Sequence, residues 1–212
     1  MDIAERRRIE KEEATQKRKE QILNAGKNLF SWMSPGSVTI AAIARECALS
    51  PPTIYLYYQS KEDLLFHIVN DFLLNGFLLL NAPMDGTGLQ RVGRVIEELK
   101  QDYLKNLQAK NLMAHFNLYY EKEYPNLPSV EEFERNAQKT NDLLEEIILS
   151  GQRDGSIRSD INPRLYGCLL GNLAGYFGTS ALRRALLIKN QKMDPYEEFC
   201  LALDLVYRDL KA

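Results

Sequence analysis

Residues 38–61 read VTIAAIARECALSPPTIYLYYQSK, and this stretch predicts two short helices joined by a tight turn. Thr39 is a favourable N-cap for the first helix. At the second helix Ser50 is the expected cap, and Pro51 occupies the first helical position, where its missing N–H is no loss. A third helix start follows at Ser60, because the sequence SKED has the spacing of a capping box. The stretch therefore predicts three closely spaced helix starts.

The second of these helices carries small, hydroxyl-bearing and aromatic residues away from its apolar side. Ile54 and Tyr57 continue the inner face, which leaves Thr53, Tyr55 and Leu56 on the outer face or its borders. A helix with such an outer face, held by a first helix across it, suits a DNA major groove. No Arg, Asn or Gln stands on that face, so we expect weak direct readout of guanine and a larger part for DNA shape.

Residues 18–65 resemble the DNA-binding domain of TetR-family transcriptional regulators. The resemblance includes Ile22, Ala25 and Phe30 on the preceding helix, and the run TIYLYYQSKEDLL at residues 53–65. It implies an all-α fold with an N-terminal three-helix DNA-binding domain and a C-terminal helical domain for ligand binding and dimerisation. It further implies a homodimer that binds a palindromic double-stranded DNA operator, most often as a repressor released by a small molecule.

The resemblance assigns DNA contacts position by position. Thr39 and Lys61 would contact phosphates, and Tyr55 and Tyr57 would hold the DNA backbone. Thr53 is the expected hydrogen-bonding base reader, with the neighbouring apolar residues pressing on thymine methyl groups. The predicted set is Thr39, Ser50, Pro51, Pro52, Thr53, Tyr55, Leu56, Tyr57 and Lys61.

Two residues depart from the family pattern. Ala48 stands where the turn usually has glycine, and a left-handed alanine costs about 1 kcal/mol. Pro52 replaces a residue that is usually glycine, and it has no N–H to give to a phosphate. These departures keep a rival open, namely a protein-interaction or pseudo-receptor module whose helix-turn-helix no longer binds DNA.

Composition and charge fit a folded DNA-binding chain. The sequence has 212 residues, of which 45% are hydrophobic, and a net charge of −2. Residues 1–61 have ten Lys and Arg against seven Asp and Glu, a net +3, whereas the remainder has 17 against 22, a net −5. The basic front half favours a nucleic-acid partner. The three cysteines are far apart in the sequence, which favours a reducing cytoplasm, and no membrane partner is expected.

The remaining pattern predicts helices throughout. Residues 1–60 form the predicted DNA-binding domain, with a charged helical extension at 1–14, and residues 61–212 form the predicted ligand-binding and dimerisation domain. A long helix should begin at Ser60 and end before the loop at 83–88. The other expected helices span residues 15–33, 89–109, 110–124, 129–150 with a stop at Gly151, 163–187, and from Pro195 to the end.

Aromatic residues with a few polar tips suggest an apolar pocket for an amphipathic or aromatic effector. Each of them could equally be ordinary core, and His115 could be a structural histidine. The predicted lining is Phe72, Phe77, Tyr103, His115, Phe116, Tyr119 and Tyr176.

Small residues repeat every four positions on the helix after Pro163, and an apolar stripe marks the last helix. Several glycines in one helix suggest a packing demand, because each costs about 0.8–1 kcal/mol relative to alanine. Together the two stripes predict a four-helix dimer interface, with packing inside one chain as the alternative. The predicted interface is Gly167, Gly171, Gly175, Phe199, Leu203 and Val206.

Enzymatic chemistry has little support in the sequence. Two histidines and three scattered cysteines give no catalytic triad and no metal-ligand spacing, and no glycine-rich loop follows a strand. We therefore expect no catalytic residue, metal or cofactor, although a helical enzyme that has borrowed the fold remains a second rival.

Overall fold

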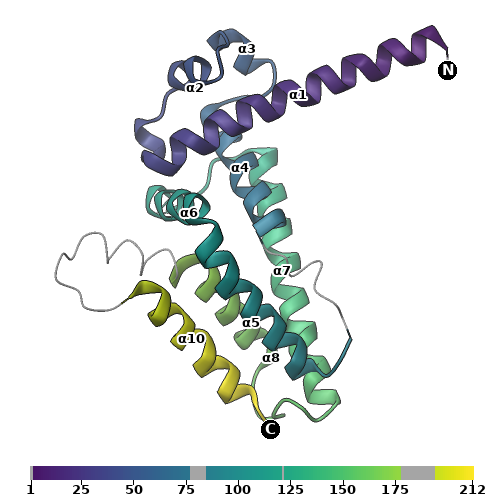
Figure 1. The fold of residues 1–212 in the computed structure, drawn as a ribbon, viewed down its shortest axis with the longest axis vertical. Helices are drawn as coiled ribbons and strands as arrows, with labels where there is room; N and C mark the ends of the chain where they lie inside the picture. The colour runs from purple at the N-terminus through teal and green to yellow at the C-terminus, as the bar shows by residue number, and fades with distance from the viewer. Residues whose placement is uncertain (1, 77–84, 121, 178–193) are drawn as a thin grey trace.

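The computed structural model describes residues 2–76, 85–120, 122–177 and 194–212, and within these ranges the fold is all-helical, as predicted. Figure 1 shows an elongated molecule with α1, α2 and α3 at one end, α5, α8 and α10 at the other, and α4, α6 and α7 connecting them. In chain order the elements are α1 (Ile3–Trp32), the 3-10 turn η1 (Pro35–Ser37), α2 (Ile40–Glu46), α3 (Pro51–Tyr55), α4 (Lys61–Gly76), α5 (Gly88–Lys105), α6 (Leu107–Tyr119), α7 (Pro128–Arg153), α8 (Pro163–Asn172), the π-helical turn η3 (Leu173–Phe177) and α10 (Pro195–Leu210).

Helix α1 is longer than predicted, since the charged extension and the expected helix from Thr15 form one continuous helix. Charge pairs one turn apart support its first turns: Arg6 Nε lies 2.9 Å from Glu10, and Arg8 Nη2 lies 2.7 Å from Glu5. Such pairs favour a helix by a few tenths of a kcal/mol each. The first turns project past the rest of the molecule (Figure 1).

Two buried clusters form the core. The N-terminal core joins α1–α4 to α6 and the start of α7, and its members are Ile22, Ala25, Phe30, Val38, Ile43, Ala44, Cys47, Ile54, Tyr58, Leu64, Leu65, Phe66, Ile68, Val69, Leu112, Phe116 and Val130. The C-terminal core joins α5, α7, α8, η3 and α10, and its members are Val92, Val95, Ile96, Leu99, Tyr103, Leu144, Ile147, Ile148, Ile157, Ile161, Leu170, Leu173, Ala174, Phe199, Leu203, Val206 and Leu210. Helix α4 therefore packs with α1, α2 and α3 as well as with α7.

Buried polar side chains fix the register of α4 against α7. Ser129 Oγ donates a hydrogen bond of 2.7 Å to Asp63 Oδ1, and Asn136 Nδ2 donates one of 2.8 Å to Asn70 Oδ1. All four residues are buried, and each helix contributes two of them seven residues apart. A sliding of α4 along α7 would leave these groups unpaired, at a cost of about 1–3 kcal/mol per group.

Several predicted boundaries of the C-terminal helices were wrong. Gly151 does not stop its helix, because α7 continues to Arg153, and the left-handed residue that follows is Gly155 with φ 76°. Residues 89–109 and 110–124 correspond to the shorter helices α5 and α6. The helix expected at 163–187 begins at Pro163 but changes to a π-helical turn after Asn172; its part beyond residue 177, like the end of the helix expected after Ser60 and like Phe77, lies outside the described residues.

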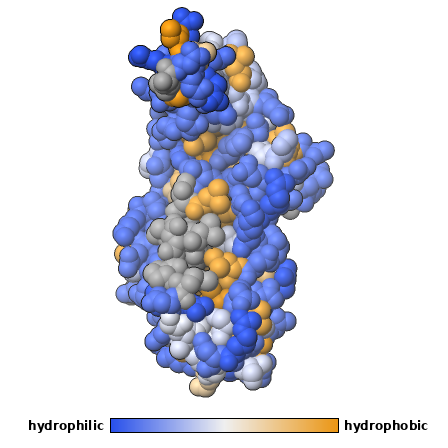
Figure 2. All heavy atoms as spheres, turned by 90° about the vertical axis from the view of Figure 1, so that its right-hand side faces the viewer, coloured by the Kyte–Doolittle hydropathy of each residue, from blue (hydrophilic) through white to orange (hydrophobic). Residues whose placement is uncertain are grey.

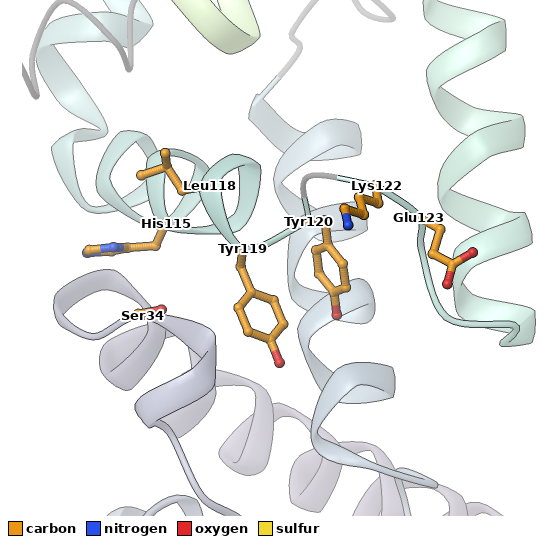
Figure 3. A pocket seen from close by; sticks show the side chains of 7 residues that line it. All are labelled: Ser34, His115, Leu118, Tyr119, Tyr120, Lys122 and Glu123. Carbon is orange, nitrogen blue, oxygen red and sulfur yellow. The ribbon is translucent and has the colours of Figure 1, made fainter.

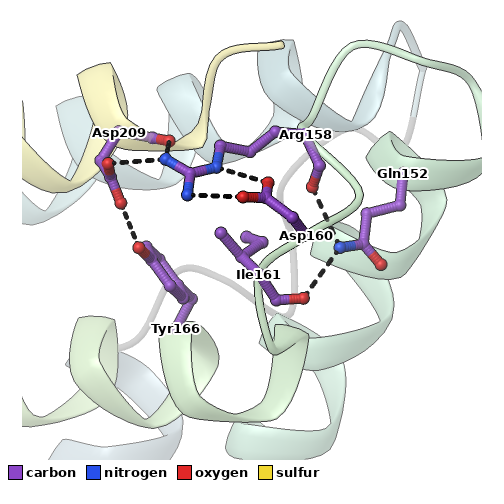
Figure 4. A network of polar contacts seen from close by, with 6 residues as sticks. All are labelled: Gln152, Arg158, Asp160, Ile161, Tyr166 and Asp209. Carbon is purple, nitrogen blue, oxygen red and sulfur yellow. Dashed lines mark hydrogen bonds and ion pairs between the residues drawn. The ribbon is translucent and has the colours of Figure 1, made fainter.

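A polar network ties the loop after α7 to α8 and α10 (Figure 4). Arg158 Nε donates 2.7 Å to Asp160, and Arg158 Nη1 donates 3.0 Å to Asp209 at the end of α10. Tyr166 on α8 also donates its hydroxyl proton to Asp209. Gln152 Nε2 donates to the carbonyls of Arg158 and Ile161, at 3.1 Å each. The network holds α8 and α10 next to each other at the end of the molecule away from α3.

In the view of Figure 2 hydrophilic residues cover most of the face, and hydrophobic atoms form small patches between them. Within the described part of the chain, no helix combines the length and the apolar character needed to span a bilayer.

Candidate functional site

The two short helices α2 and α3 begin with the caps that the sequence predicts. Thr39 Oγ1 accepts a hydrogen bond of 3.1 Å from the Ala42 amide, and Ser50 Oγ accepts one of 3.4 Å from the Thr53 amide. Pro51 is the first residue of α3. The caps satisfy amide groups that would otherwise lack a partner at each helix start, so both short helices are well defined.

The turn between them is closed by backbone hydrogen bonds around Ala48. The Leu49 amide donates 2.8 Å to the Ala44 carbonyl, and the Ala48 amide donates 3.2 Å to the Arg45 carbonyl. This pair of bonds is the Schellman motif, which places its next-to-last residue in the left-handed region. Ala48 has φ 51°, the only positive φ among the described non-glycine residues, as the departure from the family pattern predicts. Gln21 of α1 also donates 2.7 Å to the Cys47 carbonyl, so the turn is held against α1.

Helix α3 faces solvent along the side that the sequence assigned to DNA. Ile54 is fully buried, whereas Leu56 is 80% and Tyr55 is 54% exposed. Pro51 and Pro52 are exposed, and Tyr57 is half-buried against the N-terminal core. The hydroxyls of Ser50 and Thr53 lie 2.8 Å apart, so they already share a hydrogen bond at the protein surface. Large exposed apolar side chains on a short helix form a surface that a second molecule can cover.

Lys61, which was predicted to contact a phosphate, already has partners within the chain. Its Nζ donates 2.8 Å to the Pro35 carbonyl and lies 3.7 Å from Glu62, and 18% of its side chain is exposed. Its role at a phosphate remains a prediction. Arg45, in the last turn of α2, is exposed, and its side chain has no hydrogen bond or ion pair with the described residues. The sequence analysis missed it, although a cation in the helix ahead of the turn could have indicated it.

A cavity of about 430 Å³ lies where α1, α4, α5, α6, α7 and η3 meet. Apolar side chains from five of these elements line it, among them Val69, Phe72, Leu73, Leu99, Met113, Phe133 and Ala174. Its volume is in the usual range for small-molecule sites. Since α1 and α4 both line it, this cavity borders directly on the helices that support α2 and α3.

Two ion pairs also line this cavity. Lys27 Nζ of α1 lies 2.5 Å from Asp71 Oδ2 of α4, and Lys110 Nζ of α6 lies 2.9 Å from Asp102 Oδ2 of α5. The second pair is the more buried, with 12% of the Lys110 side chain and 10% of the Asp102 side chain exposed. The cavity therefore combines an apolar wall with charged groups that already have partners.

The structure separates the residues predicted to line one pocket. Phe72 lines the cavity, but Tyr103 and Phe116 are buried in the two cores. His115 and Tyr119 line a different hollow of about 690 Å³ between α6 and the residue Ser34 before η1, where Figure 3 shows both rings beside the N-terminal helices. Aromatic composition could not distinguish these three environments, whereas the charged residues of the cavity gave no signal in the sequence.

The residues of the predicted dimer stripe on α10 are covered within one chain. Phe199 and Leu203 are fully buried and Val206 nearly so, and the Phe199 ring stacks on Tyr103 at 4.9 Å. The glycine stripe also has an intrachain role: an added Cβ at Gly167 would lie 3.1 Å from the Glu145 amide of α7.

The other side of α8 and α10 carries exposed leucines that the sequence analysis missed. Leu165 and Leu169 lie one turn apart on α8, and Leu201 and Leu205 lie one turn apart on α10; each is 40–64% exposed. The spacing of one turn was visible in the sequence, but it did not tell which of two apolar stripes on α10 another helix covers.

Among the described residues, no three His, Cys, Asp or Glu side chains are placed to hold a metal ion. An exposed recognition helix behind a capped first helix, at one end of an all-helical chain, defines a helix-turn-helix DNA-binding regulator. Residues 22–68 match the family described as bacterial regulatory proteins, tetR family. Over these residues the chain is similar to the DNA-binding domain of TetR-family transcriptional regulators.

Relatives resemble this chain in sequence, and solved structures resemble it in fold. The HTH-type transcriptional regulator UidR of Escherichia coli K12 is 25% identical over 156 residues, which cover 72% of this chain and 76% of UidR. NalD, the secondary repressor of the MexAB-OprM multidrug efflux pump in Pseudomonas aeruginosa, superposes with a TM-score of 0.70 at 18% identity, over 93% of this chain and 98% of NalD. FadR from Bacillus subtilis, solved in complex with stearoyl-CoA, superposes with a TM-score of 0.68 at 16% identity, over 90% and 98% of the two chains. The two structural likenesses bear on the fold.

Proposed function

We propose that this chain is a ligand-responsive repressor, which binds a palindromic operator as a homodimer and leaves it when a small amphipathic molecule enters the cavity. In this proposal residues 1–60 bind DNA and residues 61–212 bind the effector and form the dimer. The observation that carries it is the shared boundary between the cavity and the supports of α3: Lys27 of α1 and Asp71 of α4 meet at the cavity wall. Both helices also pack in the N-terminal core with α2 and α3.

The mechanism we propose is a shift between two arrangements of α4. A ligand that pushes on Phe72 or on the Lys27–Asp71 pair would move α4 against α7, where buried hydrogen bonds favour one register. That movement would change the separation of the two α3 helices, which must be about 34–36 Å to enter successive major grooves. Ligand and operator would then weaken each other's binding by the same factor.

The dimer surface we propose is the exposed leucine face of α8 and α10, namely Leu165, Leu169, Leu201 and Leu205. It lies at the end of the molecule opposite α3 (Figure 1). A two-fold axis there leaves both α3 helices free to face the same DNA, and exposed leucines at one-turn spacing on two adjacent helices suit a four-helix interface.

The experiment that tests DNA binding is a fluorescence anisotropy titration with DNA from upstream of the chain's own gene, repeated at increasing salt. We expect Arg45→Ala to weaken binding to all sequences and to reduce the slope of log affinity against log salt by about one. Thr53→Ala should instead change the ranking among sequence variants of the bound site. Arg135→Ala, on the exposed part of α7, serves as the control and should change neither quantity.

Lys61→Ala is expected to weaken binding across all sequences as well, and its melting temperature must be measured because it also removes the contact with Pro35. If binding is absent, or does not change with salt, the interaction-module alternative is favoured over a repressor. Ala48 and Pro52, which depart from the family pattern, and the ammonium group of Lys61, which is already bonded to Pro35, support that alternative.

A further inference from the structure

The charged groups that line the cavity indicate the chemical class of its ligand. The biological meaning of this inference rests on the proposed function. Four ionisable side chains line the cavity, two cations and two anions, and each cation lies within 3 Å of an anion. Asp102 also accepts a hydrogen bond from the Asn106 side chain. The described lining therefore has no net charge and offers no cation that lacks a carboxylate.

This arrangement disfavours a charged ligand. A carboxylate or an ammonium group that enters the cavity loses its hydration, and it regains that loss only if an opposite charge is available to it. Here Lys110 and Asp102 neutralise each other at 2.9 Å in the cavity wall. A charged ligand at the intact pair would lie beside a group of its own sign, and separating the pair would leave one buried partner alone; both are unfavourable.

The same groups can still bind an uncharged polar ligand. An ammonium group has three donors and a carboxylate has about four acceptor sites, so each partner keeps hydrogen-bonding capacity beyond the ion pair. A hydroxyl or carbonyl group can use this capacity without breaking the pair. The apolar wall around Phe72, Met113 and Phe133 can cover the rest of such a molecule.

We propose that the cavity takes an uncharged amphipathic molecule with a hydroxyl or carbonyl group, small enough to fit about 430 Å³, and that it discriminates against carboxylates and amines of the same shape. The ligand's polar group contacts one of the two ion pairs, and its apolar part lies against the aromatic wall. At the Lys27–Asp71 pair such a contact reaches α1 and α4 together.

The test uses three probes with one apolar chain: decanol, decanoate and decylamine. Their affinities for the full chain are measured by isothermal titration calorimetry at neutral pH, below the concentrations at which the probes aggregate. We expect decanol to bind at least about tenfold more tightly than either charged probe, because only the charged probes must disturb an ion pair. Decanoate or decylamine binding as tightly as decanol, or no binding of decanol, overturns the proposal.

Two substitutions change the charge of the cavity in opposite directions. Asp102→Asn leaves Lys110 without its carboxylate, so the preference should move to decanoate; Lys110→Met leaves Asp102, so the preference should move to decylamine. If Asp102→Asn does not fold, Asp71→Asn takes its place: it removes the carboxylate from Lys27 at the more exposed pair, and the preference should again move to decanoate. An unchanged preference in the folded variants contradicts the proposal.

A cavity-filling variant locates the probe. Ala109→Leu should abolish decanol binding, whereas the control Gln101→Leu, at an exposed position of α5, should leave it unchanged. Decanol binding that survives Ala109→Leu places the probe elsewhere and overturns the assignment. These outcomes are independent of DNA: decanol can bind in the cavity of a chain that fails the anisotropy test, and then the proposed function fails while this inference holds.

Discussion

Ala48 shows how much one residue contributes to the helix-turn-helix. Its left-handed φ of 51° is set by the two backbone bonds that close the end of α2, not by its own preference. An alanine in this conformation is strained by about 1 kcal/mol, because its Cβ crowds the following carbonyl. The chain therefore keeps the turn of its family without the residue that makes the turn easy.

Ala48→Gly should raise the free energy of unfolding by up to about 1 kcal/mol, since glycine adopts positive φ without strain. Ala41→Gly is the matched control. Ala41 is also exposed, but it lies within α2, where glycine costs about 1 kcal/mol relative to alanine. Urea unfolding measures both changes, which should have opposite signs. Equal destabilisation by the two substitutions would show that the turn is not strained.

Buried tyrosines make the fold sensitive to alkaline pH. Burial, assisted by the charge of Asp63, raises the pKa of Tyr58 to about 12, and burial likewise raises the pKa of Tyr103 to about 12. The ordinary pKa is 10, so the unfolded chain loses these protons first as the pH rises. The stabilising contribution is complete below pH 10 and is lost as the pH rises from 10 to 12.

The free energy of unfolding should therefore decline over this window. Tyr58→Phe, which cannot ionise, should make the decline shallower, whereas Tyr55→Phe at an exposed position should not. Urea unfolding at stepped pH values gives the comparison. A decline of the same slope in Tyr58→Phe would contradict the assignment.

At the scale of elements, the start of α5 approaches the last turn of α7 so closely that Gly88 has no room for a side chain. A Cβ added at Gly88 would lie 2.2 Å from Gly151 Cα, and a Cβ added at Gly151 would lie 2.5 Å from the Ile157 side chain. The sequence predicted that Gly151 ends its helix, but Gly151 lies within α7 and packs against Gly88. A glycine in a sequence does not by itself distinguish a helix end from a close approach.

Gly88→Ala should lower the free energy of unfolding by about 1–3 kcal/mol, because backbone atoms cannot move aside as a flexible side chain can. Gly175→Ala is the control, since a Cβ there meets nothing within 4 Å. Thermal unfolding followed by circular dichroism compares the two. A tolerated Gly88→Ala would mean that α5 and α7 are farther apart than described.

At the scale of the whole molecule, local signals predicted more than long-range ones did. The caps of α2 and α3, the starts of α8 at Pro163 and α10 at Pro195, and the left-handed turn at Ala48 depend on neighbours in sequence, and the sequence predicted them. The lining of the cavity depends on which of many apolar faces meet. Periodicity identified the stripe of Leu203 on α10 but not that α5 and α8 cover it, so the exposed stripe of Leu201 was missed.

In the proposed complex α3 enters duplex DNA twice, presented by a symmetric pair of chains. Hydroxyl-radical footprinting on the upstream DNA tests this arrangement. We expect two protected stretches related by a dyad, with centres separated by one helical turn of about 10 base pairs or a multiple of it. A single protected stretch, or no protection at low salt, would contradict it.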